Sequence, residues 1–259
     1  MKPLAIILIR QLLGIGLLIS IALYQKQSFA INIKEQKWIF LLSGIASLHL
    51  YIQVTGLQYT SASNTGWIIG ITPVFMVILA RLFYKERITL TQTAGITIAF
   101  LGLLLLVSKG NFTSIDLISN KGDFLVLLSS FTWAVYSLVG KKITITYPPL
   151  MTILYLFIMM SFYLIPFTIN AENISSVLSL SITSWISILF LGLFCSGAAY
   201  VLWAQSLSDL PAAKVGAFLY IEPFVTVFAA WILLNEAISL LTFASGLIII
   251  GGVVLVNRK

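Results

Sequence analysis

The chain has 259 residues, of which 59% are hydrophobic and only 9% are charged, and its mean hydropathy is +1.05. A soluble globular domain carries about 25% charged residues, so this composition excludes a soluble domain, a nucleic-acid-binding protein, a disulfide-rich secreted scaffold and a disordered chain. The net charge of +7 reflects 15 Lys and Arg against 8 Asp and Glu, an excess typical of cytoplasmic loops in membrane proteins. We therefore expect an integral membrane protein without a cofactor.

Nine segments are apolar over about 20 residues, the length that crosses a hydrocarbon core about 30 Å thick. In chain order they are Leu4–Leu23, Trp38–Leu57, Asn64–Tyr84, Leu90–Val107, Gly122–Gly140, Pro149–Thr168, Thr183–Ser206, Ala212–Leu234 and Ser239–Val256. The connections between them are short and carry most of the charged residues. This pattern predicts an all-α polytopic membrane protein.

The lysines and arginines predict the orientation. If alternate connections share a side, one side receives most of the cations and the other receives only Lys2, Lys109 and Lys121. Cations gather on the cytoplasmic side, so the C-terminus is predicted to be cytoplasmic and the N-terminus external. Lys2 and the apolar stretch after it also resemble a signal peptide, but that stretch is long for a signal core and contains Arg10.

The sequence contains an internal repeat. At one fixed offset, residues 40–105 align without gaps with residues 190–255, and the pairs include Gly66 with Gly216, Pro73 with Pro223, Glu86 with Glu236 and Gly102 with Gly252. Equivalent helices are five places apart in the order of spans, an odd number, so the two copies should cross the membrane in opposite directions. Inverted repeats are common in transporters, with the binding site near the midplane at the repeat interface.

These motifs resemble the EamA-type transporters of the drug/metabolite transporter superfamily. The first copy has Tyr-Thr-Ser-Ala-Ser at 59–63 and a helix with a central proline; the second has Leu-Pro-Ala-Ala at 210–213 and Tyr-Ile-Glu-Pro at 220–223. The similarity covers essentially the whole chain. It implies ten helices in two inverted five-helix repeats, here residues 1–109 and 119–259, with both termini cytoplasmic.

The chain departs from that pattern at its beginning. The segment 4–23 resembles the second helix of the family, and 123–139 resembles the sixth, whose partner in the first repeat is absent. Either the first helix is missing from this sequence or the protein works with nine helices. We favour the first interpretation, because nine helices would leave the N-terminus outside; a truly incomplete protein would leave its transport activity in doubt.

Pro73 and Pro223 fall near the centres of their spans, at equivalent repeat positions. Proline cannot donate to the helix ladder, and it clashes with the carbonyl four residues earlier, here at Ile69 and Leu219. Within a membrane such freed carbonyls are tolerated only against protein or a water-filled cavity. We expect both helices to bend along a central solute pathway, with a simple packing kink as the alternative.

Glu222 lies about eleven residues into its span, roughly 16 Å deep at 1.5 Å per residue. An ionised acid at that depth costs about 2.5–3.5 kcal/mol even on lenient scales, and it usually faces a cavity or a partner. We predict that Glu222 carries the coupling proton or binds a cationic group of the substrate. The alternative is a protonated glutamic acid that bonds to a neighbouring helix.

Arg10 lies about 9 Å below the outer end of its span. It is a candidate to meet a substrate carboxylate or Glu222; the alternatives are snorkelling to the interface and a structural pairing. Other candidate pathway residues, each equally compatible with helix packing, are Asn64, Trp67, Trp133, Tyr136, Trp203 and Tyr220. A metal site is not expected, because His49 and Cys195 are the only residues of their types.

The favoured function is a secondary active transporter, an exporter or permease of small metabolites, amino acids or drug-like compounds in the cytoplasmic membrane. It would work by alternating access with a coupling proton, surrounded by lipid, and a homodimer is one assembly considered. The sequence has no Gly-x-x-x-x-Gly-Lys loop for ATP. The main alternative, an intramembrane enzyme acting on a lipid or isoprenoid, would need clustered Asp, His or Cys. A structural or assembly protein would need neither the inverted repeat nor the intramembrane acid.

Overall fold

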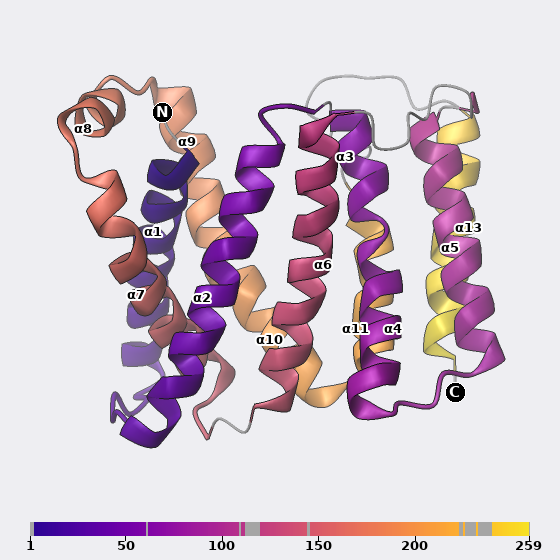
Figure 1. Cartoon of the computed structure of the whole chain (residues 1–259), viewed down its shortest axis with the longest axis horizontal. Helices are drawn as coiled ribbons and strands as arrows, with labels where there is room; N and C mark the ends of the chain where they lie inside the picture. The colour runs from indigo at the N-terminus through magenta and orange to yellow at the C-terminus, as the bar shows by residue number, and fades with distance from the viewer. Residues whose placement is uncertain are drawn as a thin grey trace. The chain divides into compact units, whose positions relative to one another are not determined.

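The computed structural model describes residues 3–60, 62–108, 110–111, 120–143, 146–222, 225, 232 and 240–258, and these residues are helical without strands (Figure 1). The first half contains α1 (Pro3–Tyr24), α2 (Ile33–Gly56), α3 (Ala62–Ile69), α4 (Thr72–Tyr84) and α5 (Leu90–Ser108). The second half contains α6 (Lys121–Lys142), α7 (Pro149–Thr168), α8 (Ala171–Leu178), α9 (Ile182–Phe190), η2 (Leu191–Ala198), α10 (Ala199–Asp209), α11 (Ala212–Ala217), η3 (Phe218–Ile221) and α13 (Leu240–Asn257).

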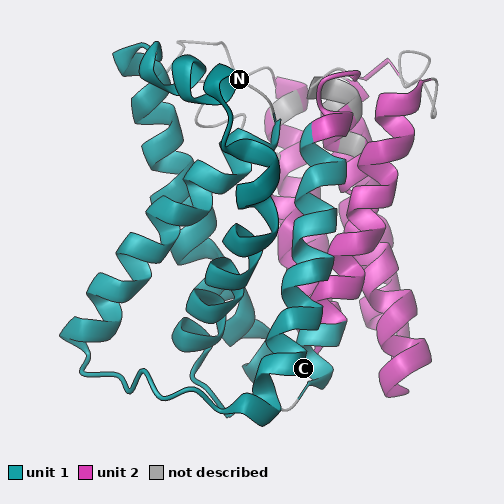
Figure 2. Cartoon of the chain, turned by 60° about the vertical axis from the view of Figure 1, so that its left-hand side comes forward, with its two compact units in different colours: residues 1–54, 139–209 teal, residues 55–138, 210–259 magenta. Residues whose placement is uncertain are grey.

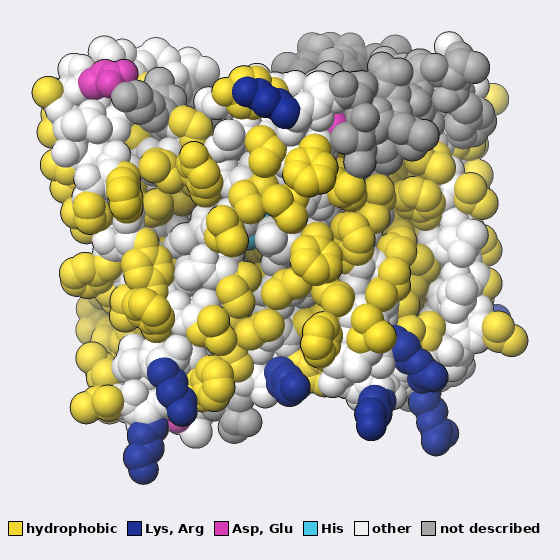
Figure 3. Space-filling model, viewed as in Figure 1, with side chains coloured by type: hydrophobic (Ala, Val, Ile, Leu, Met, Phe, Trp, Pro, Cys, Tyr) yellow, Lys and Arg dark blue, Asp and Glu magenta, His cyan; other side chains and the backbone are white. Residues whose placement is uncertain are grey.

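Five of the described helical segments are long and apolar enough to cross a membrane: Pro3–Tyr24, Ile33–Gly56, Lys121–Lys142, Pro149–Thr168 and the continuous run Ile182–Asp209. The shorter apolar helices are Thr72–Tyr84, Leu90–Leu106, Ala212–Ile221 and Phe243–Asn257. Figure 3 shows hydrophobic side chains over most of the helix surfaces in view, as a protein surrounded by lipid requires. The predicted all-α polytopic membrane fold is confirmed.

The span predicted over Asn64–Tyr84 is two helices, not one. Gly70 and Ile71 form a turn between α3 and α4, and Pro73 sits in the first turn of α4. A proline there needs no N–H partner. The prediction of a single bent helix is therefore wrong in the first copy: the helix is interrupted. In the second copy α11 ends at the equivalent depth and continues as the 3₁₀ turn η3.

Two further elements were not predicted. The short helix α8 follows α7 and begins where the Asn170 side chain accepts a hydrogen bond from the Asn173 N–H, 2.9 Å away. Within the run Ile182–Asp209, the segment η2 is a π-helix. π-Helical turns are rare and often occur at functional sites.

The chain forms two compact units, coloured separately in Figure 2, and the first contains Met1–Val54 and Val139–Asp209. In unit 1, α1 packs against α7 in the antiparallel sense. Gln11 meets Met160, and one turn further along α1 a Cβ on Gly14 would lie 2.9 Å from the Phe157 ring. These helices are equivalent in the predicted repeat, and they run in opposite directions.

Unit 2 contains Thr55–Leu138 and Leu210–Lys259, and its centre is the antiparallel pair α5 and α13. A Cβ on Gly95 would lie 2.7 Å from the Gly252 carbonyl oxygen, and one on Gly102 would lie 2.9 Å from Ile249 Cγ1. Small residues allow helices to approach this closely. These helices are also repeat equivalents, so in each unit the paired copies oppose one another. Each unit mixes the two repeats, and the repeat boundaries stay a prediction.

Candidate functional site

The helix of the first copy is interrupted between α3 and α4, at Gly70 and Ile71 of unit 2. The Ile71 N–H donates to the Ile68 oxygen at 3.0 Å, and the Val74 N–H donates to the Ile71 oxygen at 2.9 Å. Among the described backbone hydrogen bonds, none reaches the carbonyl of Ile69, the group that the sequence predicts to be freed by Pro73. Irregular backbone at membrane depth occurs where it is buried in protein or lines a cavity.

Helix α6 packs beside this interruption. The Ser130 hydroxyl lies 3.4 Å from the Ile68 oxygen and 3.1 Å from the Val126 oxygen of its own helix. Phe131 of α6 meets Phe75 of α4 edge to face, with ring centroids 5.5 Å apart. The interrupted backbone of the first copy is thus lined by a buried hydroxyl and aromatic rings.

Two predicted pathway residues lie on the same helix. Trp133 and Tyr136 are neighbours on α6, with ring centroids 5.2 Å apart at an interplanar angle of 32°. Tyr136 is buried and Trp133 is half-buried. Their position in unit 2 is consistent with a pathway lining and equally with packing.

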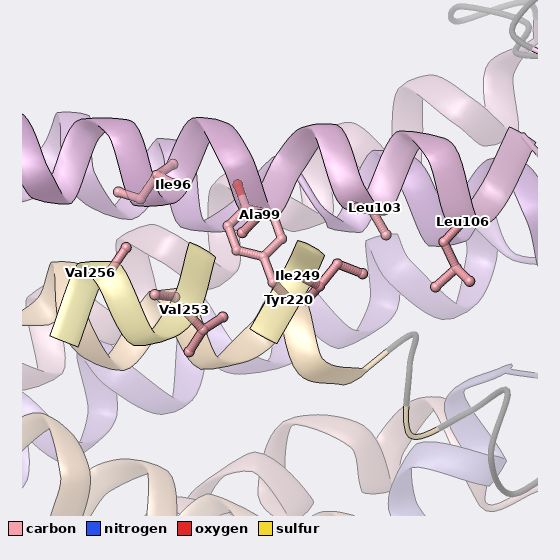
Figure 4. Close-up of a cluster of buried hydrophobic side chains, with 9 residues drawn as sticks. Ile96, Ala99, Leu103, Leu106, Tyr220, Ile249, Val253 and Val256 are labelled. Atoms are coloured by element: carbon pink, nitrogen blue, oxygen red, sulfur yellow. The ribbon is translucent and has the colours of Figure 1, made fainter. Parts of the chain in front are cut away.

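The second copy presents Tyr220 and Glu222 at its own interruption. The Tyr220 ring is fully buried among Ala99, Ile249 and Val253, and its oxygen points toward α5 (Figure 4). Among the described atoms this hydroxyl has no hydrogen-bond partner. The Glu222 N–H donates to the Leu219 oxygen, so the Leu219 carbonyl, predicted to be free, is satisfied.

The Glu222 side chain is exposed on the surface of its unit. It follows the helical turns Ala212–Ile221, which places it roughly 17 Å from their start at about 1.5–2.0 Å per residue. An acid at such a depth requires a polar cavity or a partner. The structure therefore keeps Glu222 as a candidate site residue.

Unit 1 holds the predicted residues Arg10 and Trp203. The Arg10 Nε donates to the Ser196 Oγ of η2 at 3.2 Å, a pairing that the sequence did not identify. Trp203 is half-buried in α10. The predicted contact of Arg10 with Glu222 stays a prediction, because the two residues belong to different units.

Three predicted site residues lie wholly or partly outside the described residues. Asn64 and Trp67 belong to α3, but their side chains are not described, and Pro223 is not described at all. Of the residues that are described, the structure collects Pro73, Trp133, Tyr136, Tyr220 and Glu222 in unit 2.

Sequence reasoning missed one buried acid in each unit. Glu35 accepts hydrogen bonds from the Thr146 hydroxyl at 2.6 Å, the Thr146 N–H at 2.9 Å and Asn32 Nδ2 at 2.9 Å. Asp123, which is fully buried, accepts from Thr60 and from Asn120 Nδ2.

Both acids follow an asparagine by three residues at a helix start. This spacing resembles the capping box, in which the acidic side chain bonds back to the cap residue, so a sequence signal for them existed. Both act as anchors: Glu35 holds the loop before α7, and Asp123 holds the loop before α3. Within the described part of the chain, no group of three or more His, Cys, Asp and Glu is positioned to hold a metal.

The comparisons with known proteins agree with this architecture. The EamA-like transporter family model matches residues 1–108 and 120–258. An uncharacterized transporter of Archaeoglobus fulgidus is 30% identical over 221 residues, covering 84% of this chain and 74% of that protein. A "probable terminal-alkyne amino-acid exporter" of Streptantibioticus cattleyicolor is 27% identical over 204 residues, covering 79% and 67%.

A crystal structure with 14% sequence identity superposes with a TM-score of 0.80 and covers 99% of this chain and 89% of its own. At that identity the likeness shows the fold, which is that of a multi-pass helical membrane protein. The chain belongs to the EamA-like transporter family, which confirms the resemblance seen in the sequence. Membership makes it a membrane transporter that contacts lipid and carries a small molecule.

Proposed function

We propose that this protein is a secondary active transporter that exports small metabolites, amino acids or drug-like compounds by alternating access. The observation that carries the proposal is the pair of helix interruptions in unit 2, at Gly70–Ile71 and at Phe218–Ile221, which occupy equivalent positions of the repeat. In secondary transporters, discontinuous helices near the midplane form the substrate and ion sites. The solute pathway then runs along these interruptions.

Glu222 is the proposed coupling group. It follows directly on the second interruption, where a proton or a cationic substrate would reach it from the proposed pathway. Pro73 and Tyr220 shape the same pathway, and Trp133 and Tyr136 line it. Asn64, Trp67 and Pro223 stay candidates for it from the sequence. Arg10 and Trp203 are proposed pathway residues of unit 1. Protonation of a carboxylate at this depth removes the cost of its charge, which links proton binding to the change of access.

The proposal includes the orientation and the assembly. The two inverted repeats span residues 1–109 and 119–259 and lie in the cytoplasmic membrane with the C-terminus inside, because the predicted inner connections carry most of the cations. We propose that the protein acts as a carrier and not as an enzyme, with a homodimer as the assembly to test. The amino-acid exporter among its relatives supports amino acids as the first solutes to test.

The test is transport by the purified protein in liposomes loaded with a radiolabelled mixture of amino acids, with a pH gradient across the membrane. Wild type should drive amino-acid efflux when protons are supplied from outside. Glu222→Gln should lose this proton-driven efflux while it keeps exchange of labelled for unlabelled solute. Glu172→Gln, at the exposed start of α8, is the matched acid control and should behave as wild type.

Two results would contradict the proposal. If liposomes with the wild-type protein release none of the labelled amino acids under either direction of the pH gradient, amino-acid export is excluded. If proton-driven efflux is unchanged in Glu222→Gln, Glu222 is not the coupling group, although the transport proposal still stands.

A further inference from the structure

Arg10 is a cation inside the membrane-spanning part of unit 1. It is the eighth residue of α1, and its one described hydrogen bond runs from Nε to the Ser196 hydroxyl. The acidic residues of unit 1, Glu35, Glu172 and Asp209, lie at the ends of α2, α8 and α10. A guanidinium has five N–H donors. No hydrogen bond of its two terminal nitrogens is described, and its charge interacts with the buried Tyr200 of α10.

The Arg10 side chain extends toward the middle of the span. The main-chain carbonyl oxygen of Arg10 lies level with Gly192, because a Cβ added to Gly192 would be 3.2 Å from that oxygen. Ser196 is four residues further along the helical run Ile182–Asp209 and close to its centre, about 6 Å deeper at 1.5 Å per residue. A snorkelling arginine would extend the other way, toward the nearer interface. The geometry thus disfavours the snorkelling alternative.

The surroundings of Arg10 are polar and closely packed. Ser196 is only 4% exposed, and Gly192 brings η2 so near to α1 that an added Cβ would lie 2.6 Å from Leu13 Cβ. Gln11, the next residue of α1, is 1% exposed; its Nε2 contacts Met160 Sδ at 3.5 Å, and its Oε1 has no donor among the described atoms. This layer of unit 1 therefore contains polar atoms that the described chain leaves unsatisfied.

We propose that Arg10 and Ser196 bind the carboxylate of the transported solute. This inference rests on the proposed transport function and names a substrate class for it, solutes that carry a carboxylate. The two terminal nitrogens of a guanidinium form a planar fork that matches the two oxygens of a carboxylate. The Ser196 hydroxyl accepts the hydrogen bond from Arg10 Nε, and this bond orients the two terminal nitrogens. An incoming carboxylate supplies a negative charge to the two terminal nitrogens.

The test is equilibrium binding to the full chain in phosphatidylcholine nanodiscs. The probes are the radiolabelled proteinogenic amino acids, each compared with its amino alcohol, which keeps the side chain and the ammonium but lacks the carboxylate. Wild type should bind at least one amino acid tenfold or more tightly than its alcohol. Arg10→Gln should remove the difference, Arg10→Lys should keep part of it, and Ser196→Ala should weaken amino-acid binding several-fold.

Matched controls separate the site from general effects of substitution. Arg81→Gln removes an exposed arginine near the end of α4, and Ser187→Ala removes a serine hydroxyl on α9 that bonds only locally, to the Thr183 oxygen. Both should bind amino acids as wild type does. Size-exclusion profiles of all variants establish that each is folded.

The outcomes distinguish this inference from the transport proposal. If amino acids bind and lose affinity in Arg10→Gln, but liposomes do not transport them, the carboxylate site stands and the transport proposal fails. If amino acids are transported, but Arg10→Gln leaves their binding unchanged, the site is overturned and transport stands. Absence of any preference for the acid over the alcohol also overturns the site. The site is also overturned if native mass spectrometry finds a phosphatidylglycerol molecule that wild type retains and Arg10→Gln loses, because Arg10 would then bind a lipid.

Discussion

Gly95 of α5 lies directly against the carbonyl oxygen of Gly252 in α13: an added Cβ on Gly95 would be 2.7 Å from that oxygen. The two helices occupy corresponding places in the two copies of the repeat and run in opposite directions. Their close contact joins the first copy to the second inside unit 2, beside the core that contains Tyr220. The glycines permit an approach that larger side chains would prevent.

This contact predicts different results for two adjacent glycines. Gly252→Ala would place a Cβ 2.5 Å from the Ala99 nitrogen and 2.6 Å from the Gly95 oxygen, and backbone atoms cannot move aside cheaply. We expect a loss of about 1–3 kcal/mol, the usual cost of overpacking. Gly251→Ala meets nothing within 4 Å and should gain about 0.4–1 kcal/mol, because alanine loses less backbone entropy.

The measurement is the apparent melting temperature of each variant in detergent, followed as monomer retained on size exclusion. Gly252→Ala should melt below wild type and Gly251→Ala at or above it. Equal melting temperatures for the two variants would contradict the helix contact.

The buried Tyr220 hydroxyl gives a second prediction. It has no partner among the described atoms, and a buried unsatisfied polar group costs about 1–3 kcal/mol. Tyr220→Phe should therefore raise the melting temperature, and it should lower the transport rate because Tyr220 is proposed to shape the pathway. Tyr163→Phe is the contrast: its hydroxyl donates to the Phe40 oxygen at 3.1 Å, so this variant should be less stable. A Tyr220→Phe variant less stable than wild type would show that the hydroxyl is satisfied.

The Glu35 anchor gives a third prediction. Thr146 donates both its hydroxyl and its N–H to the Glu35 carboxylate, which holds the loop before α7 against the start of α2. Thr146→Val removes the hydroxyl donor and should lower the melting temperature and speed proteolysis of this loop, whereas Thr146→Ser keeps the donor and should match wild type. Equal proteolysis rates for Thr146→Val and Thr146→Ser would contradict the stabilising role of the hydrogen bond from the Thr146 hydroxyl to Glu35.

Much of the fold follows from apolar length alone. The span predicted at Pro149–Thr168 coincides with α7 residue for residue, because a proline and a polar turn delimit one uninterrupted apolar run. The opposed directions of α5 and α13 also followed from their places in the order of predicted spans, which differ by five, an odd number, with no structural information needed.

Local backbone geometry was harder to predict. A window of 20 residues averages over the turn at Gly70 and Ile71, so Asn64–Tyr84 read as one helix. Pro73 was the one residue that could have indicated the interruption, but a proline is as compatible with the first turn of a new helix as with a kink. The π-helix η2 has no compositional signature that a hydropathy pattern can detect.

The candidate site was only partly predictable. Arg10 and Glu222 stand out in sequence because charged residues are rare deep inside spans. Ser196 does not, since 186 residues separate it from Arg10 and serine is common in these helices. Only the packing of α1 against η2 brings the two together.

The most direct test of the account is the membrane side of Glu86 and Glu236, which are equivalent in the inverted repeat. In a background where Cys195, the only native cysteine, is replaced by serine, single cysteines at these two positions can be labelled with a membrane-impermeant maleimide on intact cells. We expect the cysteine at 236 to be labelled from outside, and the one at 86 to react only after the membrane is opened. Labelling of both positions from the same side would contradict the inverted arrangement on which the proposed transport mechanism rests.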